Sequence, residues 1–377
     1  MQYKMFQQDK LSALGLGCMR LPVVDENAAA IDEPALAEMV AYAMEKGINY
    51  FDTAWAYHGG NSEAAMGRAL KAYPRESFRL ASKFPGYDEA NRERLEEIFE
   101  EQLRRCGVDY FDYYLFHNVA DGNIDGYLDP KHGIYEYLMK QKTMGRIRHL
   151  GFSTHGSLET MERFLQAYGE GMEFCQIQLN WLDWTSQNAK EKVELLNRYQ
   201  IPIWVMEPLR GGKLAALTAK DEDVLRAANP GRSVPEWGFR FLQGIPGVTM
   251  ILSGMSNFEQ LKENMEIFAD DQPLTEEERR VLLGVAADMT KQIVLPCTGC
   301  RYCVSECPQG LDIPRLLQMY NNQTVTGTMF KTPDPLFKMP REKWPTACVG
   351  CGSCEKACPQ EIRISAAMAE FAGKLKK

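Results

Sequence analysis

The sequence lacks the features that mark membrane-spanning, secreted and nucleic-acid-binding chains. No apolar run is long enough to cross a bilayer, and the N-terminal stretch MQYKMFQQDK contains no apolar core of a signal peptide. The formal net charge is −8, so no basic field attracts nucleic acid or an anionic membrane surface. These absences argue against a membrane or a nucleic acid as a partner and predict a cytoplasmic protein.

Cysteine is scarce over most of the chain, which argues against a disulfide scaffold. Of the eleven cysteines, eight lie between Cys297 and Cys358. Cys18, Cys106 and Cys175 sit in apolar segments, where a free cysteine behaves as a small buried hydrophobe. Disulfide frameworks are typical of small secreted chains, so the crowded tail of this 377-residue chain favours metal or cluster ligation.

The tail contains the motif C-x2-C-x2-C-x3-C-P twice. The first copy consists of Cys297, Cys300, Cys303 and Cys307, and the second of Cys348, Cys351, Cys354 and Cys358. Two zinc sites would also use eight thiolates, but zinc sites usually combine two separated C-x2-C pairs. Three cysteines in a row at this spacing therefore favour iron–sulfur clusters.

The repeated motif resembles the ligand run of bacterial ferredoxins. That resemblance implies two 4Fe-4S clusters, with the fourth cysteine of each motif serving the other cluster. One cluster would then take Cys297, Cys300, Cys303 and Cys358, and the other Cys348, Cys351, Cys354 and Cys307. The spacer between the motifs is long and partly helical at residues 313–320, which resembles the helical dicluster ferredoxins.

The first 290 or so residues alternate between strand-like and helix-like segments. Eight apolar, β-rich runs occur at residues 14–19, 48–54, 78–84, 111–116, 147–153, 174–180, 203–207 and 248–253. Amphipathic helical patterns lie between them, for example at residues 33–46, 62–73, 92–106 and 258–268. Eight such units predict an α/β fold, a (β/α)8 TIM barrel, because parallel strands need helical crossovers. The structural alternative is an open doubly wound sheet, which is expected to carry a G-x-G-x-x-G loop after its first strand. The sequence at that place is G-L-G-C-M-R, which differs from that pattern.

A last helix is expected at residues 275–292, where Thr275 and Glu278 form a capping box. Pro296 then opens the cysteine-rich tail. We therefore predict a barrel over residues 1–292 and a small, mostly helical iron–sulfur domain over residues 293–377.

Polar side chains stand at the ends of three successive predicted strands: Asp52 with Tyr57, Lys83, and His117. Polar residues at the C-terminal ends of barrel strands point into the active site. A carbonyl that accepts a hydride needs a proton, and a nearby ammonium lowers the pKa of a phenol from its usual value near 10. Tyr57 is then the proton donor and Lys83 its neighbour. A structural ion pair, a rim aromatic and a structural histidine are the alternatives.

These residues resemble the Asp-Tyr-Lys-His tetrad of the aldo/keto reductases, and the resemblance covers residues 10 to 290. It implies an NAD(P)H-dependent oxidoreductase that reduces an aldehyde or ketone. In this reading Asp52 holds Lys83, and His117 orients the oxygen of a small carbonyl substrate.

The resemblance also implies a dinucleotide site, with NADP favoured over NAD. Ser153 and Gln178 correspond to the residues that bind the carboxamide, although Thr154 stands where the family has asparagine. Met206 occupies the place of a stacking tyrosine. The remaining candidates for cofactor contacts are Arg20, Pro208, Leu209, Arg210, Gly211, Ser256, Gln260 and Asn264. Helix capping is the alternative role for these polar side chains.

How the two parts cooperate is left open by the sequence. Hydride transfer moves two electrons, a 4Fe-4S cluster moves one, and the chain shows no flavin signature that would split the pair. The clusters are therefore expected to be structural or to serve a redox partner protein that docks on the C-terminal domain. The alternative is a ferredoxin-type protein whose clusters pass single electrons between a partner and a substrate or cofactor in the barrel.

Overall fold

The computed structural model describes the chain except for residues 26, 292–293, 327–335, 337–338 and 376–377. The chain divides into two compact units, each of which is described by itself. The first unit comprises Met1–Pro208 and Pro235–Arg279, and the second Leu209–Val234 and Arg280–Lys377. The predicted boundary at residues 292 and 293 lies outside the described residues, so the two predicted domains stay a prediction.

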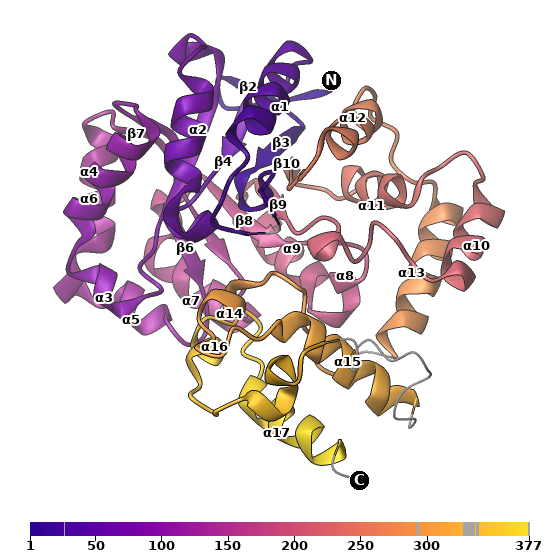
Figure 1. Ribbon diagram of the computed structural model, residues 1–377. Coiled ribbons are helices and arrows are strands. Elements are labelled where there is room, and N and C mark those ends of the chain that lie inside the picture. Colours follow the sequence, from indigo (N-terminus) through magenta and orange to yellow (C-terminus); the bar gives the residue numbers. More distant parts are fainter. Residues whose placement is uncertain (26, 292–293, 327–335, 337–338, 376–377) are drawn as a thin grey trace. The chain divides into compact units, whose positions relative to one another are not determined.

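The first unit is built on a closed barrel of eight parallel strands, surrounded by helices (Figure 1). The neighbours around the barrel follow the order β10-β3-β4-β5-β6-β7-β8-β9. The strands are β3 (Leu14–Gly17), β4 (Tyr50–Asp52), β5 (Arg79–Phe84), β6 (Phe111–Val119), β7 (Ile147–Thr154), β8 (Phe174–Gln178), β9 (Ile203–Met206) and β10 (Val248–Ser253). Each lies within or overlaps one of the eight predicted runs, so the predicted TIM barrel is confirmed.

The barrel strands are almost wholly buried because side chains fill the barrel and helices cover its outside. The helices that follow them along the chain are α1 (Glu33–Glu45), α2 (Ser62–Leu70), α3 (Glu89–Arg92), α4 (Leu95–Cys106), α5 (Ile124–Leu128), α6 (Ile134–Thr143), α7 (Leu158–Tyr168), α8 (Asp183–Ser186), α9 (Ala189–Arg198), α11 (Val234–Gln243) and α12 (Phe258–Ile267). Local signals fix their ends: the Ser157 and Asn257 side chains cap α7 and α12, and α4 ends at Gly107, which has a φ of 65°. The barrel thus follows from hydrophobic runs and caps that the sequence displays.

An N-terminal hairpin that the sequence analysis did not predict packs on the barrel. Its strands, β1 (Tyr3–Phe6) and β2 (Asp9–Ser12), pair antiparallel. Phe6 and Leu11 join a buried cluster with Tyr50 and Trp204, near the starts of β4 and β9. The hairpin therefore closes the end of the barrel at which the strands begin, and it leaves their C-terminal ends for function.

Helix α13 (Glu276–Thr290) begins at the predicted capping box. The Thr275 backbone N–H donates to the Glu278 carboxylate (2.9 Å), and the Glu278 N–H donates to the Thr275 hydroxyl (3.2 Å). The predicted helix end at residue 292 lies outside the described residues. Among the helices that the structure describes, none is long and apolar enough to cross a membrane.

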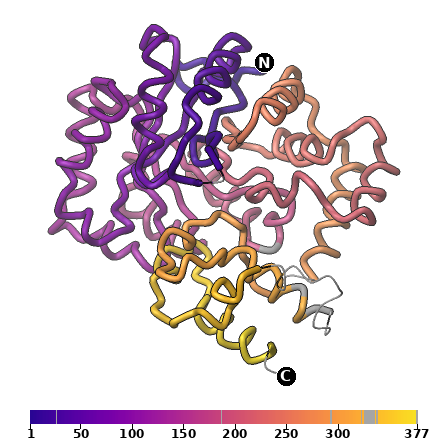
Figure 2. Tube along the Cα trace, viewed as in Figure 1, coloured from indigo at the N-terminus to yellow at the C-terminus, as the bar shows by residue number. Residues whose placement is uncertain are grey.

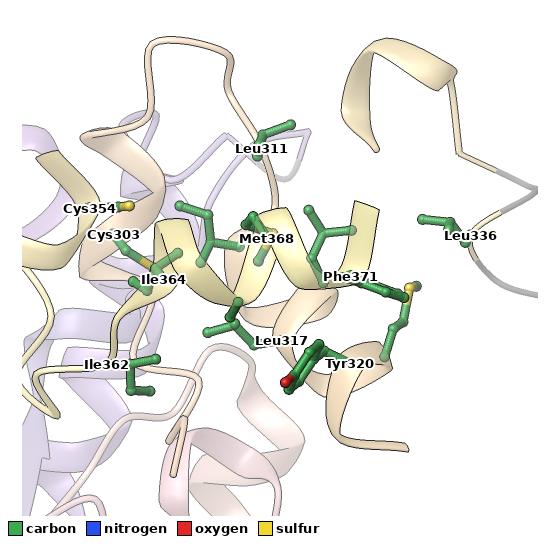
Figure 3. Packing of buried hydrophobic residues seen from close by; sticks show 14 residues of the cluster. Cys303, Leu311, Leu317, Tyr320, Leu336, Cys354, Ile362, Ile364, Met368 and Phe371 are labelled. Carbon is green, nitrogen blue, oxygen red and sulfur yellow. The ribbon is translucent and has the colours of Figure 1, made fainter. Parts of the chain in front are cut away.

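The second unit contains α10 (Ala219–Ala228) and four helices of the tail, which is orange to yellow in Figure 2: α14 (Tyr302–Ser305), α15 (Ile313–Thr326), α16 (Ser353–Lys356) and α17 (Ile364–Lys374). The mostly helical tail and the helix in its spacer are as predicted. Figure 3 shows Met368 and Phe371 of α17 against Leu317 and Tyr320 of α15, in one buried cluster that includes Cys303. This apolar core holds the two cysteine motifs in a single small body.

Backbone conformation repeats between the two cysteine motifs. Gly299 and Arg301 have φ values of 78° and 72°, and Gly350 and Gly352 have 68° and 72° at the matching places of the second motif. A left-handed conformation is rare for a non-glycine residue such as Arg301. Both motifs therefore fold as the same turn.

Candidate functional site

The four residues of the predicted tetrad come together in the first unit. Asp52 ends β4, Lys83 lies in β5 and His117 in β6, while Tyr57 begins the 3-10 turn Tyr57–Gly60. Lys83 is fully buried, and Asp52, Tyr57 and His117 are 3%, 7% and 4% exposed. Parallel neighbouring strands bring these side chains to one end of the barrel.

Lys83 is the centre of the group. Its Nζ donates to Asp52 Oδ1 (2.6 Å), to the Thr53 carbonyl (2.8 Å) and to Tyr57 Oη (3.4 Å). Burial raises the pKa of Asp52, and the Lys83 ammonium acts in the opposite direction. The arrangement places a cation beside a phenol oxygen, which favours the phenolate.

His117 faces the same group through its ring. It meets the Tyr57 ring edge-to-face with centroids 6.0 Å apart, and the Tyr87 ring at 5.2 Å. Burial, and then the charge of Lys83, hold the pKa of His117 well below its usual value. His117 Nδ1 is buried and has no hydrogen-bond partner within the described part of the chain. A neutral imidazole of this kind is able to donate one N–H to a bound oxygen.

The two residues predicted to bind a carboxamide end neighbouring strands. Ser153 Oγ accepts a hydrogen bond from the Asn118 backbone N–H (2.8 Å). The amide of Gln178 contacts His155 Nδ1 through its oxygen (3.0 Å) and donates to Asp183 Oδ2 (2.7 Å) through its nitrogen. The hydroxyl and the amide form the kind of neutral hydrogen-bonding set that recognises a carboxamide.

Arg20, Ser256 and Gln260 come together at the start of α12. Ser256 Oγ donates to the Arg20 carbonyl (3.0 Å), and the Ser256 N–H donates to Gln260 Oε1 (2.8 Å). Asn264 lies deeper, where its amide donates to Ser253 Oγ (3.0 Å). A cation, a hydroxyl and a helix N-terminus suit a phosphate group.

The predicted cofactor stretch after β9 is divided between the units. In the first unit, Met206 pairs with Gln178 in the strand register, and Pro208 is buried. In the second unit, Leu209 precedes a 3-10 turn, Arg210–Gly212, in which Arg210 is 3% exposed with φ 47° and Gly211 has φ 65°. A left-handed conformation is uncommon for a non-glycine residue such as Arg210, and it often occurs at functional sites.

The second unit contains two small cavities lined by cysteine. The first cavity is lined by Cys297, Cys300, Cys303 and Cys358. The second cavity is lined by Cys307, Cys348, Cys351 and Cys354. Each therefore combines three cysteines of one motif with the fourth of the other, which is the crossed set that the motif implies.

The thiols that line the first cavity influence one another. Burial, and then the charges of Cys300, Cys297 and Cys358, raise the pKa of Cys303. No group of three or more His, Cys, Asp or Glu side chains in the described ranges is arranged to hold a single metal ion. Cys18, Cys106 and Cys175 are buried and free, in agreement with the prediction.

Comparison with known proteins agrees with this geometry. A sequence model of the aldo/keto reductase family matches residues 13–282, and a 4Fe-4S dicluster domain matches residues 296–362. The chain therefore belongs to the aldo/keto reductase family, a class of enzymes, and carries a 4Fe-4S domain at its C-terminal side.

Several curated proteins are similar over the barrel. An uncharacterized oxidoreductase of Bacillus subtilis is 26% identical, with 72% of this chain and 92% of that protein covered. A probable aldo-keto reductase of Glycine max is 30% identical over 54% of this chain, and the match spans only 57% of that relative. The NADH-specific methylglyoxal reductase of Escherichia coli is 28% identical, with 56% of this chain and 68% of that protein covered.

Solved structures give the same fold. The holo form of an aldo-keto reductase from Bacillus halodurans is similar with a TM-score of 0.63 and 25% identity, over 76% of this chain and 96% of that one. An aldo-keto reductase from Klebsiella pneumoniae in complex with NADPH has a TM-score of 0.60 and 23% identity, over 75% of this chain and 94% of that one.

Several contacts around the site were not predicted from the sequence. They include the Thr53 carbonyl on Lys83, Tyr87 beside His117, and Asp183 on Gln178. The signal for Asp183 is the run N-W-L-D after β8, in which Asn180 and Asp183 bond each other (2.7 Å). The backbone contact of Lys83 has no sequence signature.

Proposed function

We propose that the protein reduces an aldehyde or ketone with a hydride from NADPH, and that Tyr57 is the general acid. The observation that carries the proposal is the Lys83 ammonium, buried 2.6 Å from Asp52 and 3.4 Å from the Tyr57 hydroxyl. An ammonium so placed stabilises the phenolate that remains after proton donation.

In the proposed reaction a bound reduced nicotinamide supplies the hydride to the carbonyl carbon. Tyr57 donates the proton that the resulting alkoxide oxygen needs, so a hydride and a proton together convert the carbonyl into an alcohol. Neutral His117 donates an N–H to the same oxygen and orients it. Asp52 neutralises Lys83 and holds it beside the phenol.

The proposed cofactor contacts follow the geometry of the first unit. Ser153 and Gln178 would hold the carboxamide, and Met206 and Pro208 would line the nicotinamide. Arg20, Ser256 and the start of α12 would receive a phosphate, with Gln260 and Asn264 shaping that turn. The sequence-based assignment of Leu209, Arg210 and Gly211 to the pyrophosphate stays a prediction. NADP is favoured over NAD by the cation at Arg20.

We also propose that the two cysteine cavities each hold one 4Fe-4S cluster. Four cysteines per cavity are the number that such a cluster takes, and the crossed sets are those of two-cluster ferredoxins. The cluster that is held by the first cavity is called the first cluster, and the other the second cluster. In this proposal the clusters stabilise the tail or exchange electrons with a redox partner protein. The redox partner and the cytoplasmic location stay predictions.

The alternative is a ferredoxin-type electron-transfer protein whose clusters pass single electrons between a partner and a substrate or cofactor in the barrel. It needs two clusters that lie close together, and one apolar core surrounds both motifs. Adding NADPH alone to the oxidised protein under anaerobic conditions separates the two proposals, because bleaching of the cluster absorption supports the relay.

The reductase proposal is tested with Tyr57→Phe. NADPH oxidation by a panel of aldehydes and ketones is measured on the anaerobically purified full chain, together with NADPH binding. We expect kcat to fall about 100-fold or more, since general acid catalysis contributes on that scale, while NADPH binding is retained.

Tyr50→Phe is the matched control. Tyr50 lies in the buried cluster near the strand starts, so loss of its hydroxyl leaves carbonyl reduction unchanged. Full activity of Tyr57→Phe would remove the acid role, and loss of activity in both variants would point to a folding defect.

A further inference from the structure

A lysine from outside both cysteine motifs lies across one of the cluster loops. Lys213 Nζ donates to the Cys297 carbonyl (2.9 Å). Its Cε lies 3.2 Å from the place that a Cβ on Gly299 would take, and Gly299 has a φ of 78°. Lys213 therefore covers the turn between Cys297 and Cys300, where a Cβ at position 299 would be in tight contact with it.

The second cavity has a counterpart. Lys343 Nζ donates to the carbonyls of Gln309 (2.9 Å) and Gly310 (3.0 Å), which are two and three residues after the motif residue Cys307. A Cβ on Gly310 would lie 2.9 Å from Lys343 Nζ, and the φ of Gly310 is 57°. Because Cys307 lines the second cavity, the two lysines act on loops of different cavities.

Lys213 has an unusual origin for a residue beside a cluster. It belongs to the segment Leu209–Val234, which lies in the chain between β9 and β10 and within the range of the aldo/keto reductase match. That segment forms part of the second unit and contributes a cation to it. The 4Fe-4S domain match begins only at residue 296 and does not include this lysine.

From these contacts we infer that Lys213 is a positioning residue that anchors the loop of the first cluster and raises its reduction potential. The inference rests on the proposed clusters. A reduced cluster carries one more negative charge, so a nearby ammonium favours it, and net charge is one of the factors that set such potentials. A lysine from the part of the chain that matches the aldo/keto reductase family thereby raises the reduction potential of the first cluster. Lys343 has the corresponding effect on the second cluster.

The test is a redox titration of the full chain, reconstituted anaerobically and followed by electron paramagnetic resonance. Lys213→Met removes the charge and keeps an unbranched side chain that is only one atom shorter, and Lys213→Arg keeps the charge. We expect Lys213→Met to disfavour reduction of one cluster up to about tenfold, which is about 59 mV for one electron, and Lys213→Arg to have a much smaller effect. Lys343→Met is the matched control and should shift the other cluster.

The outcomes separate this inference from the proposed function. Wild-type protein without four-iron clusters contradicts the proposed clusters and leaves the reductase proposal to its own test. With both clusters present, Lys213→Met overturns the inference if it leaves both potentials unchanged or shifts both equally. If Lys213→Met binds one cluster fewer while Lys213→Arg binds both, the anchoring role is supported. Loss of the same cluster in Lys343→Met contradicts it.

Discussion

At the scale of single residues, the fully buried Lys83 needs its partners. An isolated ammonium in a protein interior costs several kcal/mol, and removing one partner of a buried ion pair costs about 3–5 kcal/mol. Lys83 is compensated by Asp52 and by the Thr53 carbonyl. An ion pair with only a structural role does not require a phenol oxygen near its ammonium. The 3.4 Å contact between Lys83 Nζ and Tyr57 Oη is therefore the observation that favours a catalytic role.

The charge of His117 can be tested by pH. Its pKa is lowered by burial and then by Lys83, so the folded protein keeps it neutral where an unfolded chain already binds a proton. Stability is then lost as pH falls below about 6.5, the ordinary histidine value. We expect the His117 signal in a histidine-labelled NMR titration to remain that of the neutral ring at about pH 6.5, where an ordinary histidine is half protonated.

The same reasoning extends to activity. The profile of kcat/KM should show no acid limb with a midpoint near the ordinary histidine value. An acid limb at that midpoint that disappears in His117→Asn would contradict a neutral histidine donor.

At the scale of secondary-structure elements, a buried network attaches two helices to the strand of Lys83. Gln102 of α4 donates to the Lys83 carbonyl (3.0 Å) and to the carboxylate of Glu63 on α2 (2.6 Å). Its oxygen accepts from the Tyr114 hydroxyl (2.5 Å) of β6. One amide thus joins four elements behind the site.

Replacing the Gln102 amide should lower the free energy of unfolding. Gln102→Leu leaves several buried polar groups without a partner, and we expect a loss of about 2–4 kcal/mol of unfolding free energy. Chemical denaturation followed by circular dichroism measures it. Glu97→Gln on the same helix, which breaks an exposed pair with Arg94, should leave the free energy of unfolding unchanged within the error of the measurement. Equal effects of the two changes would contradict the role of the network.

The sequence predicted the barrel elements well because each strand is a run of apolar residues and each helix has a periodic face. It predicted that the tetrad residues come together because Asp52, Lys83 and His117 lie at or near the ends of three successive strands, and Tyr57 follows the first of them. It missed the hairpin of β1 and β2, whose strands have four residues each and mix charged with apolar side chains, so that neither forms an apolar run. It also missed Lys213, since the contact joins two segments 84 residues apart and neither carries a motif for it.

At the scale of the whole molecule, the cysteine motifs make a prediction about how ligands are shared. The first cavity uses Cys358 and the second uses Cys307, each from the other motif. If both cavities hold clusters, substitution of two cysteines of the same motif removes one cluster when both line the same cavity. It removes both clusters when the two cysteines line different cavities.

Two double variants test this crossing against separate motifs. Cys307→Ser with Cys348→Ser damages only the second cavity, so about four of about eight irons should remain per chain. Cys307→Ser with Cys300→Ser damages both cavities and should leave few irons, although both changes lie in one motif. Anaerobic purification with iron and sulfide counts gives the answer. The reverse result, in which the pair within one motif keeps four irons, would show that each motif binds its own cluster, and zinc in place of iron would exclude clusters altogether.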